Sequence, residues 1–195
     1  RVLKTEDGAN YAAVPISGWV QGVWYNKKAF QEKGLKEPET WEDILAAAKA
    51  FNDPANKKYG IALATAKSVM TEQVFSQFAL SNGANVLNGE GKAALDTPEM
   101  KEAIEYYQEL AKYTMPGSND VSQVKDAFLN GSAPMVIYST YILPDAYKEG
   151  ITDDLGYAVP TKKQGAAFGV VSALTITNGL DDNQKAAAEK FVAFM

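Results

Sequence analysis

Residues 14–30 read VPISGWVQGVWYNKKAF, a strand-like run that passes directly into a helix-like one. Aromatic and β-branched residues in the first half predict two short strand segments, separated by a bend at Pro15 and Gly18. The next letters, KKAFQEKG, predict a short helix closed by glycine, and residues 37–51, EPETWEDILAAAKAF, predict a longer helix with Thr40 as its N-cap. A strand followed by helices is the unit from which an α/β fold is built.

The same alternation continues to the end of the chain. Further strand-like segments lie at residues 59–64, 133–138, 156–160 and 170–176, and further helix-like segments at residues 70–84, 95–113, 120–131, 139–150 and from about residue 181. The helix at 95–113 has Thr97 as its cap, Pro98 at its first position and a buried stripe that is expected to include Ile104. The alternation predicts an α/β fold with a mixed, mostly parallel sheet flanked by helices, in which ligands bind where strands lead into helices.

Composition excludes several classes of chemistry. The 195 residues contain no cysteine and no histidine, which removes thiol nucleophiles, imidazole bases and the usual zinc ligand sets. Nineteen basic residues are scattered among 24 acidic ones, and the net charge of -5 argues against nucleic acid as a partner. No stretch approaches the roughly 20 apolar residues that span a bilayer. We therefore expect a folded protein with no cofactor, no metal and no transmembrane segment.

Catalysis has few candidates in this sequence. The adjacent acidic pairs at residues 6–7, 153–154 and 181–182 stand in turn contexts and are interpreted as solvated charges. The sequence contains no nucleophile elbow, no Walker loop and no dinucleotide-binding glycine pattern. A carbohydrate-active hydrolase stays open as an alternative, and it would need two carboxylates about 5 to 9.5 Å apart in a pocket.

Binding needs less than catalysis does: a hollow, aromatic faces and polar groups that orient the ligand. Several aromatic residues lie in the predicted strand-to-helix loops: Trp19, Tyr138, Tyr141 and Phe168. Amide and hydroxyl residues accompany them: Gln21, Ser139, Thr140 and Ser172. This combination suits a sugar, which has an apolar C–H face and a polar rim. The remaining aromatic residues of helices and strands are assigned to packing, among them Trp24, Trp41, Tyr106, Tyr107 and Tyr113.

Several motifs follow one another in an order that identifies a family. The first is a proline, a variable strand, YNK and a helix, and it is followed by a proline and TW with two acidic residues in EPETWED. FALSNGANVL, LDTPEMKEAIEYYQELAK and VKDAFLNGSAPMVIYSTYIL come next, and LGYAVPT with FGVVSALTI comes last. In this order the motifs resemble the family-1 extracellular solute-binding proteins of carbohydrate ABC transporters. The resemblance covers nearly the whole chain, and TWEDILAAAKAF combined with AFLNGSAPMVI is its most specific part.

The resemblance implies a periplasmic-binding-protein-like (type II) fold and a receptor, not an enzyme, that traps a mono- or oligosaccharide in a cleft between two lobes. It places residues 71–73 in a variable loop and residues 169–172 in a glycine-rich approach loop, although QGAAFGVVS has only one of the family's paired glycines. Stacking on the sugar would fall to Trp19 and Tyr141; the alternative for Trp19 is an exposed rim or a contact with the other lobe. The implied ligand-binding residues are Trp19, Gln21, Glu72, Gln73, Ser139, Tyr141, Gly169 and Ser172.

The resemblance also implies an organisation and a setting. Residues 1–155 would form most of the second lobe, with a hinge-crossing strand near 11–22, and residues 156–195 would return toward the first lobe, so that the chain is truncated at both ends. An ABC transporter permease is the implied partner. The implied location is periplasmic or extracellular, with a lipoprotein anchor in a Gram-positive source and no signal peptide in this chain. Exposed apolar surface on such a fragment predicts a non-native dimer, and an inactive structural fragment stays open as a second alternative.

Overall fold

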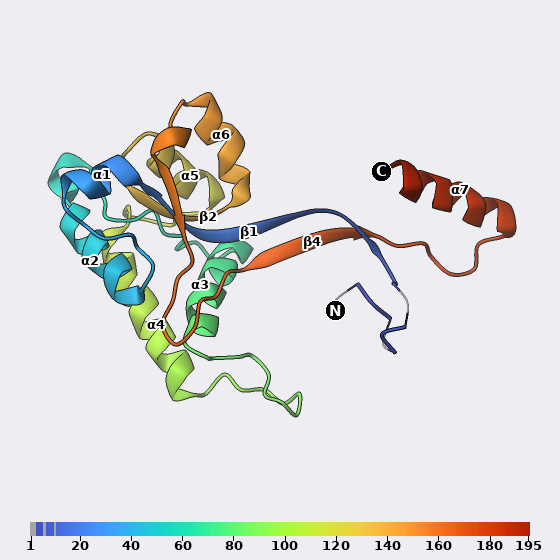
Figure 1. Ribbon diagram of the computed structural model, residues 1–195. Coiled ribbons are helices and arrows are strands. Elements are labelled where there is room, and N and C mark those ends of the chain that lie inside the picture. The colour runs from blue at the N-terminus through green and yellow to red at the C-terminus, as the bar shows by residue number, and fades with distance from the viewer. Residues whose placement is uncertain (1–2, 6, 10) are drawn as a thin grey trace. The chain divides into compact units, whose positions relative to one another are not determined.

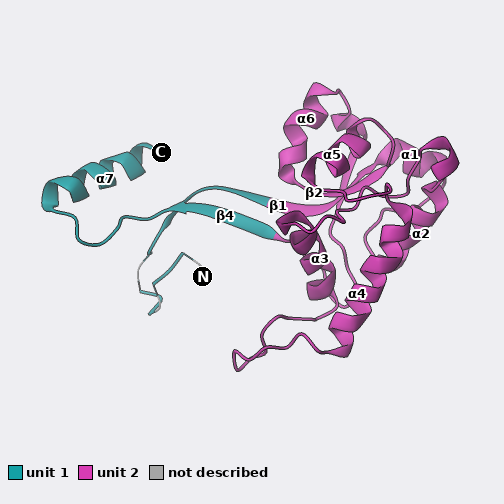
Figure 2. Cartoon of the chain, turned by 180° about the vertical axis from the view of Figure 1, so that it is seen from behind, with its two compact units in different colours: residues 1–19, 169–195 teal, residues 20–168 magenta. Residues whose placement is uncertain are grey.

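The computed structural model describes residues 3–5, 7–9 and 11–195 (Figure 1). The strands are β1 (Val14–Asn26), β2 (Met135–Ser139), β3 (Leu155–Ala158) and β4 (Gly169–Leu174). The α-helices are α1 (Lys27–Glu32), α2 (Trp41–Phe51), α3 (Val69–Ser81), α4 (Pro98–Leu110), α5 (Val121–Leu129), α6 (Leu143–Lys148) and α7 (Asp182–Phe194). Short 3-10 turns are η1 (Pro54–Asn56), η2 (Ala111–Tyr113), η3 (Thr140–Ile142) and η4 (Thr152–Asp154). The chain divides into unit 1, residues 1–19 and 169–195, and unit 2, residues 20–168 (Figure 2).

The sheet of unit 2 is built around β1, with β2 on one side and β3 on the other. Both neighbours run antiparallel to β1: Val23 pairs with Ile137 of β2 and with Ala158 of β3. Every residue of β2 is buried, and so are five consecutive residues of β1, from Gln21 to Tyr25. Burial of consecutive residues means that both faces of these strands are covered, because successive side chains point to opposite faces.

The expectation of a mostly parallel sheet is wrong for β1, β2 and β3, although the α/β class is confirmed. Parallel pairing occurs at single bridges, between Ala62 and Val136 and between Thr40 and Thr161. The reason is that the alternation of helices and strands favours a parallel crossover only between the strands that it joins. The segment around Ala62 leads through helices to β2 and runs parallel to it, whereas β1 enters the sheet in the opposite direction.

Helices α2, α4 and α5 of unit 2 begin at caps that the sequence predicts, whereas α6 begins at Leu143, four residues after the start of the predicted helix. The hydroxyl of Thr40 caps α2 and that of Thr97 caps α4, and each accepts a hydrogen bond from the backbone N–H three residues later. Asp120 and Gln123 form the predicted capping box of α5. After α3 the chain turns at Gly83, where φ is 85°, a conformation that favours glycine. These signals act within one helical turn, so they can be read from the sequence.

The core beside α4 differs in one residue from the predicted stripe. Ile104 was expected to be buried, but 43% of its side chain is exposed. The buried side of α4 is centred on Ala103 and on the half-buried Tyr106, whose ring stacks on Trp41 with 4.2 Å between the ring centroids. The Tyr106 hydroxyl donates a hydrogen bond to the backbone oxygen of Trp41, so this aromatic residue reaches the core without leaving its polar end unpaired.

The segment at residues 59–64 contains the expected buried run, but it is not a strand. It forms a single bridge at Ala62, whose N–H donates to the backbone oxygen of Met135. The N–H of Leu63 donates instead to the side-chain hydroxyl of Thr114. Successive backbone N–H groups of an extended chain point to opposite sides, so the N–H of Leu63 faces away from β2, and the hydroxyl of Thr114 satisfies it without a further strand.

Unit 1 contains the first part of β1, together with β4 and α7. β1 continues through Pro15 and Gly18, so the predicted bend between two strand segments is wrong. A Cβ atom on Gly18 would lie 2.9 Å from the backbone oxygen of Val170, which means that this glycine permits the close approach of β4. Asp181 and Gln184 form a capping box at the start of α7, where the sequence predicts the final helix.

Candidate functional site

The expected ligand-binding residues fall in both units, and each unit is described by itself. Unit 2 contains Gln21, Glu72, Gln73, Ser139 and Tyr141. Unit 1 contains Trp19, Gly169 and Ser172. Four of the five residues in unit 2 are linked by two hydrogen bonds and one cross-strand pairing, and the fifth, Glu72, is not part of that group.

Gln21 is the centre of the connected group. It lies in β1 and is only 1% exposed. Its side-chain Nε2 donates a hydrogen bond of 3.1 Å to Oε1 of Gln73 in α3. In the register of the sheet, Gln21 lies opposite Ser139 of β2. The strand pair and the helix α3 therefore meet at this glutamine.

Ser139 ends β2 and begins the turn that carries Tyr141. The Ser139 hydroxyl accepts a hydrogen bond from the backbone N–H of Tyr141, as the N-cap of η3. The Tyr141 side chain is 64% exposed, whereas Tyr138 within β2 is 7% exposed. Burial raises the pKa of the Tyr138 phenol, which accords with a packing role for that ring. Of these two tyrosines, Tyr141 is the one that offers its ring to solvent.

Gln77 belongs to the same group and is not among the residues predicted from the sequence. Gln77 is fully buried, and its Nε2 donates a hydrogen bond of 2.9 Å to Oε1 of Gln21. Residues 71–73, expected in a loop, lie instead in α3, so that Gln73 and Gln77 are one turn apart on the same helix. This i, i+4 pair of amides inside an apolar pattern was the signal that could have indicated Gln77.

Glu72 lies on a different side of α3 from its neighbour Gln73. The Glu72 carboxylate accepts a hydrogen bond of 3.0 Å from the hydroxyl of Ser76. It lines a mainly apolar hollow of about 270 Å³ together with Phe75 and Leu80, and this hollow does not include Gln73. Successive helix residues point about 100° apart, so Glu72 and Gln73 have different surroundings.

In unit 1, Trp19 is a half-buried residue of β1, and Gly169 and Ser172 are exposed residues of β4. The approach loop expected at residues 169–172 is therefore wrong, because this segment is a strand. The two valines between Gly169 and Ser172 provide the physical reason, since β-branched side chains favour the extended backbone.

The adjacent acidic pairs are exposed or act as helix caps where the structure describes them. Asp153 and Asp154 are exposed in η4, and Asp181 caps α7 through its side chain. Glu6 lies outside the described residues. Its neighbour Asp7 accepts a hydrogen bond from the hydroxyl of Thr5, which lowers the pKa of the Asp7 carboxyl. The carboxylates described here serve as caps or as solvated charges.

A groove of about 300 Å³ on unit 2 does contain several carboxylates. It is lined by Trp41, Glu42, Leu45, Glu102, Glu105, Tyr106, Glu109 and Lys162. The hydrogen bond from Lys162 lowers the pKa of Glu42, and hydrogen bonds from Lys112 and Tyr113 lower the pKa of Glu109. A glycosidase needs one carboxyl group whose pKa is raised so that it can donate a proton. Glu42 and Glu109 are shifted in the opposite direction, which argues against the hydrolase alternative at this groove.

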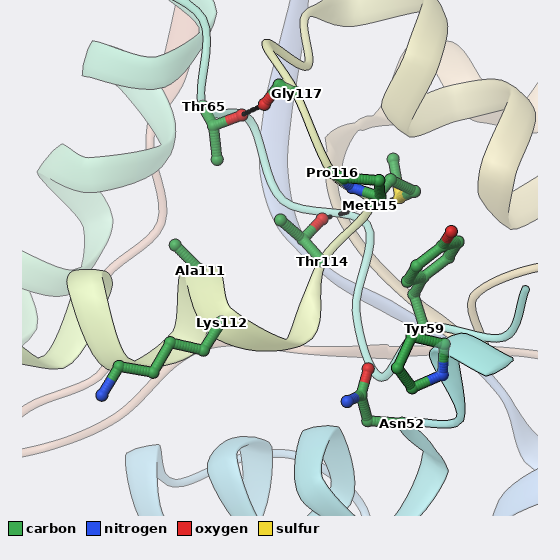
Figure 3. A pocket seen from close by; sticks show the side chains of 10 residues that line it. Asn52, Tyr59, Thr65, Ala111, Lys112, Thr114, Met115, Pro116 and Gly117 are labelled. Atoms are coloured by element: carbon green, nitrogen blue, oxygen red, sulfur yellow. Dashed lines mark hydrogen bonds between the residues drawn. The ribbon is translucent and has the colours of Figure 1, made fainter.

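Another pocket of unit 2 has a volume of about 470 Å³, and none of the expected site residues lines it. Figure 3 shows the side chains that do line it. The pocket lies beside η2 and the loop that follows it. The hydroxyl of Thr65 donates to the backbone oxygen of Gly117, and that of Thr114 accepts from the N–H of Leu63. These hydroxyls hold neighbouring loops together, so we assign them to the fold and not to a ligand.

The amino-acid sequence is similar to those of bacterial binding proteins. A family model described as bacterial extracellular solute-binding protein matches residues 2–195. The Escherichia coli (strain K12) protein YcjN, whose name describes it as an ABC transporter periplasmic-binding protein, is 57% identical over 195 residues. That match covers 100% of this chain and 45% of YcjN. The chain spans about half the length of the curated relatives it matches.

Solved structures are similar over almost the whole chain. A solute-binding protein of an ABC transporter from Agrobacterium radiobacter K84, in complex with ribitol, gives a TM-score of 0.81 at 26% identity, over 98% of this chain and 50% of that one. A homologous protein from Agrobacterium vitis S4 with bound D-mannitol gives 0.77 at 29% identity, over 97% and 48%. These likenesses confirm the type II periplasmic-binding-protein fold. None of the described helices combines the length and the apolar character that a bilayer span requires.

Proposed function

The chain belongs to the bacterial extracellular solute-binding proteins, and we propose that the protein binds a mono- or oligosaccharide, or a related polyol, for delivery to an ABC importer. The proposed working step is reversible binding, and the ligand leaves the protein chemically unchanged. Because the chain spans about half the length of its curated relatives, this activity is proposed for the whole protein, to which unit 2 contributes ligand contacts.

One observation carries the proposal: a side-chain hydrogen bond, a cross-strand pairing and a backbone N–H to hydroxyl hydrogen bond link, in this order, Gln73, Gln21, Ser139 and Tyr141 of unit 2. The series combines an exposed phenol ring with half-buried and buried amide and hydroxyl groups. A saccharide matches both features, because its C–H face packs against an aromatic ring and its hydroxyl groups exchange hydrogen bonds with amides. Within this series we assign stacking to Tyr141 and hydrogen bonding to Gln73 and Ser139.

The relatives support the same class of ligand and setting. Two of them, at 26% and 29% identity, carry ribitol and D-mannitol, and YcjN is named as a periplasmic-binding protein. We therefore propose a periplasmic or extracellular location and an ABC transporter permease as the partner. The roles of Trp19, Gly169 and Ser172 stay predictions. So does the division into a lobe of residues 1–155 and a returning segment of residues 156–195.

A panel of ligands on the full-length protein tests the proposed function. The panel contains ribitol, D-mannitol, D-tagatose, maltose and glucose, with glycine, glutamate and a divalent cation as members of other ligand classes. A ligand that binds only the folded state raises the melting temperature, and the stabilisation is about 2.7 kcal/mol at a hundred times Kd. We expect a saturable rise for at least one saccharide or polyol. A rise with an amino acid or the cation alone would contradict the proposal, and so would no rise with any saccharide or polyol.

A further inference from the structure

Three glutamine side chains of unit 2 form a directed chain of hydrogen bonds. Gln77 donates to Oε1 of Gln21 at 2.9 Å, and Gln21 donates to Oε1 of Gln73 at 3.1 Å. Gln77 and Gln21 are 0% and 1% exposed, whereas Gln73 is half-buried. The chain thus leads from the interior of unit 2 to the one amide that solvent and ligands can reach.

The surroundings of this chain favour the direction in which it runs. Nε2 of Gln21 also lies 3.8 Å from the sulfur of Met70, a weak acceptor. Reversal would turn the Gln21 oxygen toward that sulfur and would leave both N–H groups of the Gln77 amide without an acceptor. In the observed direction, Oε1 of Gln77 is the one buried amide atom of Gln77 and Gln21 that lacks a partner among the described residues. A buried carbonyl oxygen without a partner is a more common exception in proteins than a buried N–H.

The backbone holds Gln21 in place from both sides. Its N–H donates a hydrogen bond of 2.7 Å to the backbone oxygen of Phe168, and its own backbone oxygen accepts one of 3.1 Å from the hydroxyl of Tyr157. Gln21 is also paired with Ser139 across the sheet. These contacts fix the base of the side chain, so that the direction of the amide is decided by Gln77 and Met70.

The chain of hydrogen bonds determines which end of the Gln73 amide stays available to a ligand. Its Oε1 is occupied by Gln21, and its Nε2 donates no hydrogen bond to any described residue. We propose that Gln77 and Gln21 are positioning residues that hold the Gln73 amide with its NH₂ group outward, so that this part of the site is a hydrogen-bond donor and selects an acceptor oxygen of the ligand. The proposal rests on the proposed function and deepens it. A ring, glycosidic or hydroxyl oxygen satisfies the donor, whereas a group that can only donate, such as an ammonium, does not.

The direction of the chain can be measured without any ligand. In ¹⁵N-labelled full-length protein, the side-chain NH₂ protons of Gln21 and Gln77 should exchange with solvent at least about tenfold more slowly than those of exposed Gln31, because both amides are buried and hydrogen-bonded. The NH₂ protons of Gln73 should exchange at a rate close to that of Gln31. Single Gln→Met variants assign the signals. Protection of the Gln73 NH₂ equal to that of Gln21 would overturn the proposal, since it would mean that Gln73 donates inward.

Ligand addition then tests the donor role. With D-mannitol as the first probe, or ribitol if only that compound raises the melting temperature, saturation should shift and protect the Gln73 NH₂ signals and leave those of Gln21 and Gln77 in place. An unchanged Gln73 NH₂ at saturation would overturn the proposal. If the exchange pattern is as expected and no saccharide or polyol binds, the proposed function fails together with the ligand half of the inference, while the direction of the chain stands.

Variants distinguish positioning from packing. Gln77→Met preserves the length of the side chain and removes the donor to Gln21, so that the Gln73 amide loses its fixed direction; we expect affinity for the same probe to fall about tenfold. Gln31→Met, on the exposed surface of α1, is the matched control and should change affinity by less than about twofold. Unchanged affinity in Gln77→Met would overturn the positioning role. If Gln77→Met does not fold, Met70→Leu takes its place, because it removes only the sulfur acceptor of Gln21. An unchanged exchange rate of the Gln73 NH₂ protons together with unchanged affinity in Met70→Leu would also overturn the positioning role.

Discussion

Tyr138 and Tyr141 are three residues apart, and their surroundings are opposite. Tyr138 belongs to β2, where every residue is buried, and its backbone oxygen accepts a hydrogen bond from Nε1 of Trp24. Tyr141 lies past the end of the strand, in a 3-10 turn capped by Ser139. Because the strand ends before Tyr141, the ring of Tyr141 lies outside the core. We assign stacking on the ligand to this ring.

Replacement of Tyr141 by alanine tests this assignment. Because the side chain is 64% exposed, Tyr141→Ala should change the free energy of unfolding by no more than about 0.5 kcal/mol. Loss of the stacking ring should weaken affinity for the saccharide or polyol found in the panel by roughly tenfold, as measured by isothermal titration calorimetry on the full-length protein. Tyr147→Ala is the matched control, because Tyr147 is an exposed tyrosine of α6. Equal loss of affinity in both variants, or in neither, would remove Tyr141 from the site.

At the scale of elements, α3 and α4 determine which side chains meet the sheet. α3 carries Gln73 and Gln77 on the side that faces Gln21, and α4 packs against α3. α4 starts at a cap that closes within its own first turn: the hydroxyl of Thr97 accepts a hydrogen bond of 3.2 Å from the backbone N–H of Met100. The start of this helix is therefore determined locally, whereas its position against α3 depends on packing.

The cap of α4 makes a quantitative prediction. Thr97→Ala removes the acceptor for the Met100 N–H and should lower the free energy of unfolding by about 1 kcal/mol. Thr97→Ser keeps the hydroxyl and should retain most of that stability. Urea unfolding measures the difference, with the midpoint lowered in the alanine variant and the m-value unchanged. The role of the cap would be refuted if serine destabilised the protein as much as alanine.

At the scale of the whole molecule, buried phenols make stability sensitive to alkaline pH. Burial, with a smaller contribution from the neighbouring Glu37 carboxylate, raises the pKa of Tyr25 to about 12. Burial also raises the pKa values of Tyr106 and Tyr107, whose hydroxyls donate to backbone oxygens in the core. An unfolded phenol loses its proton at about pH 10, while the same phenol in the folded protein retains it. Their contribution to stability is complete below about pH 10 and is lost as pH rises through the pKa of the folded state.

Unfolding in urea at a series of pH values between about 9 and 12 measures this loss. For each phenol the free energy of unfolding should fall by at most about 1.4 kcal/mol per pH unit above about pH 10. Tyr25→Phe cannot ionise, so this variant should show a shallower decline than the wild type. All other side chains are the same in both proteins, so the comparison cancels their contribution. Identical slopes in the two proteins would contradict the assignment to Tyr25.

The sequence alone determined the features that form within a few residues. Thr40, Thr97 and the pair Asp120 and Gln123 cap the helices where their patterns predict, because a capping hydrogen bond closes within one turn. The order of the motifs indicated the solute-binding family and, with it, the α/β fold. The position of Tyr141 just after a strand could also be predicted from the sequence, because the end of a strand is a local signal.

Only the tertiary structure decided which of these elements meet and in which direction. The alternation of strands and helices left the antiparallel direction of β1 unspecified, and the sequence did not show that Gln73, and not Glu72, contacts Gln21. The hydrogen bonds of Gln21 join residues 52 and 56 positions apart, so its partners depend on how α3 packs on the sheet. Local signals act through backbone geometry within a turn, whereas the polarity of a buried amide is determined by neighbours that only the packed fold brings together.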